Sequence, residues 1–277
     1  MTRETTRARV TSVPILVYHS VSRDPSPWIG SLSVTPAAFR RHLRLIAEAE
    51  ATLLRVSDFV DAIVRGSGLP ERPVLITFDD GFSDFRSEAW PALREAGFVA
   101  TLYVTTGFLE GFHRASGVKR PPGPWLRWDA LPDLREQGVE IGGHSHTHPH
   151  LDTLSAEAAR REIKVCREVL ERLLQAPVRS FAYPHGFLSR SVRDLVRESG
   201  FDSACAVKNR LSSSDDDPLA LARLTVRSTT TPAELATWLS GRGTPVAPSR
   251  ELLRTRAWRT YRRGRAFVER RPGTDWR

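Results

Sequence analysis

Two short motifs carry side chains of the kinds that bind metal ions and transfer protons. Two adjacent carboxylates, Asp79 and Asp80, follow an apolar run at 74–76. Farther along the chain, His144 and His148 belong to a group of four histidines within seven residues. A His-x3-His pair and one carboxylate can supply three protein ligands to a divalent ion, which leaves a position open for water. The two motifs together predict a catalytic metal site.

Each motif also has a purely structural interpretation. The Asp-Asp-Gly sequence at 79–81 is typical of a turn in which an aspartate caps the next helix. A histidine-rich loop can be solvated and bind nothing. A third motif, FAYPHG at 181–186, has a Pro-x-Gly turn that either closes a loop or directs a backbone N–H at an oxyanion. On the residues alone, both interpretations of this third motif stay open.

The three motifs lie at the ends of predicted strands. Short β-branched or apolar runs alternate with helical patterns, which is typical of βα units around a parallel sheet or barrel. In such folds the active site lies at the carboxyl ends of the strands. The predicted strands are 14–21, 74–79, 99–105, 139–142, 178–183, 202–207 and 222–226.

The sequence also predicts the N-termini of three helices between or after these strands. Thr35 followed by Pro36 predicts an N-cap with proline at the first helical position, and the helix should reach about residue 50. Thr231 has the capping-box spacing to a glutamate and should begin a last helix that ends near residue 240. Ser155 begins a long amphipathic pattern that Pro177 ends.

The bulk composition is that of one soluble globular domain rather than a disordered or fibrous chain. The 277 residues are 40% hydrophobic and 26% charged. No apolar run approaches the roughly 18 residues that span a bilayer, and the N-terminus lacks the apolar core of a secretory signal. We therefore expect a cytoplasmic location. Cys166 and Cys205 belong to no C-x-x-C pair, so we predict that both are buried thiols.

The positive charge of the chain is concentrated near its C-terminus. Residues 241–277 hold eleven arginines against three acidic residues, a net +8 of the formal +9 of the whole chain. We therefore expect a catalytic domain at 1–240 and a basic tail at 241–277. Arginines mixed with aromatic residues suit an anionic membrane surface, which would place the protein at the inner membrane face. Nucleic acid competes for any arginine cluster but is not expected as a partner, and a solvated tail is the remaining interpretation.

The order and the sequences of these motifs resemble those of the polysaccharide deacetylases, carbohydrate esterase family 4. The resemblance covers about residues 14–240 and rests on TFDDG at 77–81, HSHTHP at 144–149 and FAYPHG. It implies a deformed (β/α) barrel of about seven strands. It also implies that Asp79 is the general base. By the same resemblance Asp80, His144 and His148 bind a divalent metal ion, which is usually zinc.

Two positions depart from the usual pattern of that family. Its third motif begins Arg-x-Pro, with the arginine orienting the base, and Ala182 occupies that place here. Its late Leu-x-His motif supplies the acid, and no histidine follows Leu221. Both departures occur in the branch resembling biofilm poly-N-acetylglucosamine deacetylases, where a histidine on the first strand stands in for the missing one. His19 matches that place and is expected to be the general acid; without the resemblance, a buried strand histidine is the simpler interpretation.

The remaining predicted site residues concern the substrate. Tyr183 and His185 of the third motif and Trp128, whose indole could stack on a sugar, are the expected substrate-binding residues, with core packing as the alternative for Trp128. The expected function is metal-dependent hydrolysis of an N-acyl bond, above all N-acetyl, in an amino sugar or glycan intermediate. Two alternatives stay open: a non-sugar amidohydrolase acting on a linear or cyclic amide, and a catalytically silent glycan-binding or membrane-scaffold protein.

Overall fold

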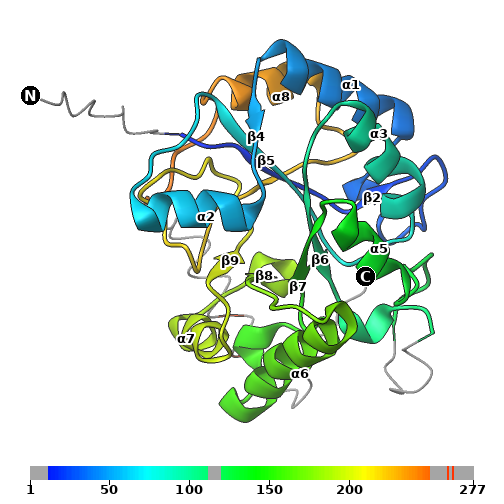
Figure 1. The fold of residues 1–277 in the computed structure, drawn as a ribbon, viewed down its shortest axis with the longest axis vertical. Coiled ribbons are helices and arrows are strands. Elements are labelled where there is room, and N and C mark those ends of the chain that lie inside the picture. Colours follow the sequence, from blue (N-terminus) through cyan, green and yellow to red (C-terminus); the bar gives the residue numbers. More distant parts are fainter. Residues whose placement is uncertain (1–11, 112–119, 250–260, 262–263, 265–277) are drawn as a thin grey trace, which may run out of the picture.

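A curled parallel sheet lies at the centre of the computed structural model, which describes residues 12–111, 120–249, 261 and 264 (Figure 1). Its strands are ordered β10–β1–β5–β6–β7–β8–β9, and all neighbours in this order are parallel. They are β1 (Ile15–Tyr18), β5 (Pro73–Phe78), β6 (Thr101–Val104), β7 (Glu140–Gly143), β8 (Ser180–Ala182), β9 (Ser203–Cys205) and β10 (Leu224–Thr225). Short β4 (Thr52–Leu53) pairs with β5, and β2 (Ser20–Val21) pairs with β3 (Ser33–Val34).

The two edges of the sheet come together at the segment that precedes β10. Cys205 of β9 forms a parallel bridge with Leu221, and the N–H of Ala206 donates to the Leu221 carbonyl at 2.8 Å. The predicted deformed (β/α) barrel of about seven strands is confirmed, because each of the seven predicted strands occurs within a few residues of its expected bounds.

Helices surround the sheet (Figure 1). They are α1 (Pro36–Glu48), α2 (Val56–Arg65), α3 (Trp90–Glu95), α5 (Ala130–Glu136), α6 (Ala156–Leu174), α7 (Arg190–Glu198) and α8 (Pro232–Leu239). The three predicted helix starts are confirmed by their caps. The side-chain oxygens of Thr35, Ser155 and Thr231 each accept the backbone N–H three residues later, at 3.2 Å.

The alternation of side chains along a strand decides which residues reach the barrel interior. All six residues of β5 are buried. Leu75 packs in an interior cluster with Tyr103, whereas Ile76 and Phe78 pack in the layer that includes the outer helices. Asp79 lies four residues after Leu75 and therefore continues the interior face at the carboxyl end of β5.

The chain after α8 returns to the body of the molecule. The N–H of Leu211 donates to the Pro245 carbonyl at 3.1 Å, and the N–H of Ala247 donates to the Leu211 carbonyl at 2.8 Å. The domain boundary near residue 241 stays a prediction. The proposed contacts of the basic tail fall almost entirely outside the described residues and also stay predictions.

In the part of the chain that the structure describes, no helix is both long and apolar enough to cross a membrane. The predicted burial of both cysteines is confirmed.

Candidate active site

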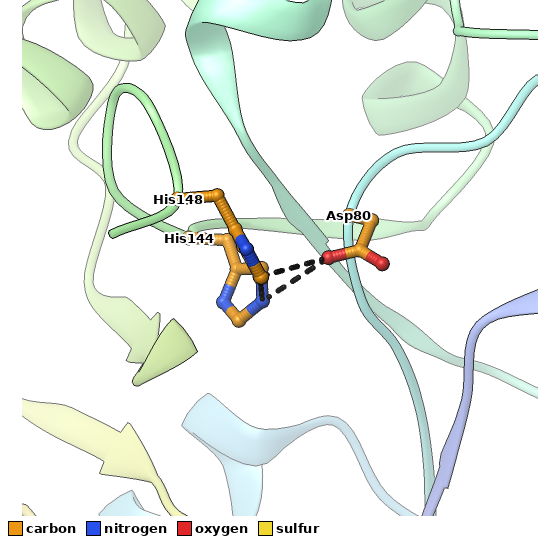
Figure 2. Close-up of side chains that lie close together, drawn as sticks. All are labelled: Asp80, His144 and His148. Atoms are coloured by element: carbon orange, nitrogen blue, oxygen red, sulfur yellow. Dashed lines mark hydrogen bonds and ion pairs between the residues drawn. The ribbon is translucent and has the colours of Figure 1, made fainter. Parts of the chain in front are cut away.

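Three side chains from the carboxyl ends of β5 and β7 point toward one another (Figure 2). Oδ1 of Asp80 lies 3.4 Å from Nε2 of His144 and 3.2 Å from Nε2 of His148. The two Nε2 atoms are 3.2 Å apart. All three residues are buried. Among the described residues, they form the one group of three His, Cys, Asp or Glu side chains whose ligand atoms could hold a metal ion.

This triangle of atoms has the dimensions of a metal site. A tetrahedral zinc ion with bonds of about 2.0–2.1 Å separates its ligand atoms by about 3.3–3.4 Å. Nδ1 of His144 lies 2.8 Å from the Ala182 carbonyl. A carbonyl only accepts, so Nδ1 carries the proton and the lone pair of Nε2 faces the other two ligand atoms. Oδ1 of Asp80 is buried with no hydrogen-bond partner. The three residues therefore fit a divalent ion.

The backbone at two of these residues is in the left-handed region. The φ angles of Asp80 and His148 are 76° and 61°. For residues other than glycine such conformations cost about 1–3 kcal/mol and persist where the surroundings hold them. The N–H of Thr105 donates to the Asp80 carbonyl at 3.2 Å, and the N–H of His148 donates to Oγ of Ser145 at 3.0 Å. Strained backbone at both residues is consistent with a functional site.

Neighbouring groups shift the pKa of Asp80 and that of His144. Burial acts to raise the pKa of Asp80, but His144 and His148 outweigh it and hold that pKa well below its ordinary value. Burial acts to lower the pKa of His144, and here Asp79 and Asp80 outweigh it and raise that pKa. The two carboxylates therefore favour a positive charge beside them.

Asp79, the predicted base, lies beside this group and is held by an arginine. Nη1 and Nη2 of Arg223 donate to Oδ1 and Oδ2 of Asp79, each at 2.7 Å. Oδ2 of Asp79 is also 3.9 Å from Nε2 of His144. Burial acts to raise the pKa of Asp79, but Arg223 and His144 outweigh it, and the pKa is lowered. Asp79 is therefore held ionised and oriented, as a general base must be.

Arg223 is fully buried and was missed by the sequence reasoning. Its Nη1 also donates to Oγ1 of Thr77 at 3.1 Å, its Nε donates to the Ala206 carbonyl at 3.2 Å, and its guanidinium lies 5.5 Å from the ring centre of Tyr103. Arg223 thus supplies the guanidinium that the usual family pattern would place at the position of Ala182. The one available signal was an arginine within the apolar run LALARLTV at 219–226, because a charge in a predicted buried strand requires a partner.

His19 lies between β1 and β2, on the same rim as the two aspartates. Its Nδ1 is buried and has no hydrogen-bond partner among the described residues. Burial lowers the pKa of His19, although the negative charges of Asp80 and Asp79 act in the opposite direction. The structure therefore places the predicted acid within electrostatic reach of the predicted base, and its role stays a prediction.

The three predicted substrate-binding residues have different surroundings. Tyr183 is fully buried and its hydroxyl donates to the Leu219 carbonyl at 2.8 Å, and its role in substrate binding stays a prediction. The ring of His185 lies 4.5 Å from that of His148, centre to centre, which places it beside the metal ligands. Trp128 is 43% exposed and remains available for stacking.

The fold and the donor set define a metal-dependent hydrolase built on a deformed (β/α) barrel. Residues 66–204, half of the chain, match the family model described as polysaccharide deacetylase, and the chain belongs to this family. It is therefore an enzyme of the class that hydrolyses N-acyl bonds of amino sugars.

Individual relatives agree with this assignment. A poly-β-1,6-N-acetyl-D-glucosamine N-deacetylase of Staphylococcus epidermidis is 23% identical over an alignment of 235 positions that covers 76% of this chain and 78% of the relative. The structure of the Streptococcus pyogenes deacetylase PplD has a TM-score of 0.73 at 22% identity and covers 84% of this chain and 99% of its own. IcaB from Ammonifex degensii has a TM-score of 0.67 at 21% identity, with the same coverages. The resemblance to the poly-N-acetylglucosamine deacetylase branch is thus confirmed, and the two structures show the shared fold.

Proposed function

We propose that this protein removes N-acetyl groups from glycans that contain N-acetylglucosamine, with a zinc ion held by Asp80, His144 and His148. The observation that supports this most is the convergence of three ligand atoms within 3.4 Å beside a buried aspartate that a guanidinium holds. The name of the staphylococcal relative supports the choice of sugar.

The chain's own residues divide the chemistry between them. When bound, a divalent ion activates water and polarises the acyl carbonyl. Asp79 accepts the proton of the attacking water, because Arg223 keeps its carboxylate ionised and fixes its direction. A backbone N–H at His185 helps to hold the oxyanion. His19 protonates the departing amine, which is a poor leaving group unless it gains a proton.

The first expected result concerns the metal and the reaction together. Purified protein should contain one zinc ion per chain and should release acetate from β-1,6-linked N-acetylglucosamine oligomers. Chelation should abolish acetate release, and added zinc should restore it. His148→Ala should lose both zinc and activity because it removes one of three ligands. Elemental analysis and an acetate assay measure the two quantities.

A neighbouring histidine provides the matched control. His146 lies in the same loop, but its Nδ1 contacts Oγ1 of Thr106 at 2.9 Å instead of a ligand atom. The variant His146→Ala should therefore keep zinc. Equal zinc in wild type and His148→Ala would contradict the ligand assignment. Zinc without acetate release, but with turnover of small N-acyl amides, would identify a non-sugar amidohydrolase.

The second expected result separates catalysis from packing at His19. His19→Gln should lower turnover by roughly 10²-fold or more, as loss of a general acid does. The melting temperature should change by only a few degrees, because Nδ1 of His19 makes no hydrogen bond to the described residues. Acetate release and thermal unfolding are measured on the same preparations. A large loss of stability with unchanged specific activity would show that His19 is a packing residue.

A further inference from the structure

A glutamate on α6 holds the loop that connects the two predicted histidine ligands. Oε2 of Glu162 accepts the backbone N–H of His146 at 3.0 Å and that of Thr147 at 2.7 Å. Oε1 accepts the hydroxyl of Thr147 at 2.7 Å. Both oxygens of one carboxylate are thus used by the segment between His144 and His148, which we call the ligand loop. Hydrogen bonds to a charged acceptor are stronger than neutral ones, so these contacts fix the loop well.

The ligand loop needs such support because only one of its ends is part of the sheet. The N–H of His144 donates to the Val104 carbonyl at 2.9 Å, directly after β7. His148 lies beyond the strand, and both Ser145 and His148 have a φ angle of 61°. A loop of L residues with two such angles does not keep this shape by backbone preference alone. The position of Nε2 of His148 therefore depends on side chains that contact the loop.

Glu162 is attached to a rigid part of the fold. In α6 the residues on either side of it that face the sheet, Ala159, Ile163 and Cys166, are all buried. The helix packs against β7. It can come close there because Gly143 has no side chain: a Cβ at that position would lie 3.1 Å from Sγ of Cys166. The Glu162 carboxylate is thus fixed relative to the strand that carries His144.

We propose that Glu162 is a positioning residue for the metal centre, because it holds His148 at ligand distance from His144 and Asp80. This inference rests on the metal site of the proposed function. Residues that orient metal ligands typically change metal affinity by about 10–100-fold when they are removed. Glu162 contacts no ligand atom itself and acts through the peptide groups of His146 and Thr147.

Zinc affinity measured without substrate tests this role. Metal-free wild type, Glu162→Ala and Glu162→Gln are titrated with zinc against a chromophoric chelator of known affinity. Glu162→Ala should raise the zinc Kd by about 10–100-fold. Glu162→Gln should stay within several-fold of wild type, because the amide oxygen can accept the two N–H groups and the amide nitrogen can donate to the Thr147 hydroxyl. The matched control is Glu168→Ala, since Glu168 lies on the same helix and has its ion pair with Lys164 on the exposed surface.

The possible outcomes distinguish the inference from the proposed function. If wild type binds no zinc, the proposed metal site itself fails. If wild type binds zinc and Glu162→Ala binds it equally well, only the positioning role is overturned. Equal weakening by Gln and Ala would overturn the hydrogen-bond argument and leave charge as the cause. Should Glu162→Ala not fold, Thr147→Val removes one of the same hydrogen bonds from the loop side and should weaken zinc binding in the same direction.

Discussion

Asp79→Asn is expected to keep its zinc and to lose nearly all turnover, by roughly 10⁴-fold at the upper end of what a general base contributes. The three ligand atoms belong to other residues, so metal content should not change. The amide cannot accept the proton of the attacking water, although it is almost the same size as the carboxylate. The measurements are zinc by elemental analysis and acetate release per folded molecule, because Arg223 loses its charged partner and stability will fall as well.

The control is an aspartate of the same segment. Asp84 is buried and accepts the hydroxyl of Ser20 at 2.6 Å, a hydrogen bond that Asn can also accept. Asp84→Asn should therefore stay within a few-fold of wild-type turnover. Wild-type activity in Asp79→Asn would mean that the base lies elsewhere. Loss of zinc together with activity would instead show that Asp79 helps to bind the ion.

The strands and the ligand motifs could be predicted because their signals are local. Each strand is a short apolar run between helical patterns, and the three expected ligands follow two of these runs directly. In a parallel sheet the carboxyl ends share one edge, so residues far apart in sequence are brought together without further information. The proximity of Asp80 to His144 follows from this rule, whereas the position of His148 also depends on the contacts that hold its loop.

The direction of a side chain at a strand end is harder to predict from a motif, as Tyr183 illustrates. Residues of a strand alternate between the two faces of the sheet. In β8 and just after it, Ala182 packs in the interior cluster, whereas Phe181 and Tyr183 pack in the outer layer. The motif alone does not show that strand alternation directs the ring of Tyr183 into this outer layer.

The partner of the base could not be found from local patterns, because it is 144 residues away in sequence. Ala182 lies on β8 and Arg223 lies directly before β10, yet both reach the barrel interior where Asp79 points. An arginine at either position can therefore hold the same carboxylate. The position of β10 next to β1, and of β1 next to β5, is what brings Arg223 within reach. That order is a property of the closed sheet rather than of any segment.

Arg223→Met is expected to destabilise the fold by about 3–5 kcal/mol at neutral pH, since it leaves a buried carboxylate without its partner. In the wild type the pKa of Asp79 is lowered in the folded state. The pair therefore stabilises the fold above the unfolded pKa of about 3.9, and this contribution is lost as pH falls through the folded pKa. Without Arg223, burial, which acts to raise this pKa, is opposed only by His144 and His19, so the folded pKa should rise. Acidification should therefore destabilise the variant less than it destabilises the wild type.

Two measurements test the role of Arg223, and the sign of each change is predicted. The stability difference between wild type and Arg223→Met, from urea unfolding, should be largest near neutral pH and should shrink on acidification. The acid limb of the pH–rate profile should move to higher pH in the variant, because a protonated Asp79 cannot act as the base. Arg193→Met is the control: Arg193 pairs with Asp217 at 2.6 Å with side chains 29% and 36% exposed, and its loss should cost no more than about 1 kcal/mol. An acid limb at the wild-type position would show that Arg223 does not set the charge of Asp79, and its role would then be structural support alone.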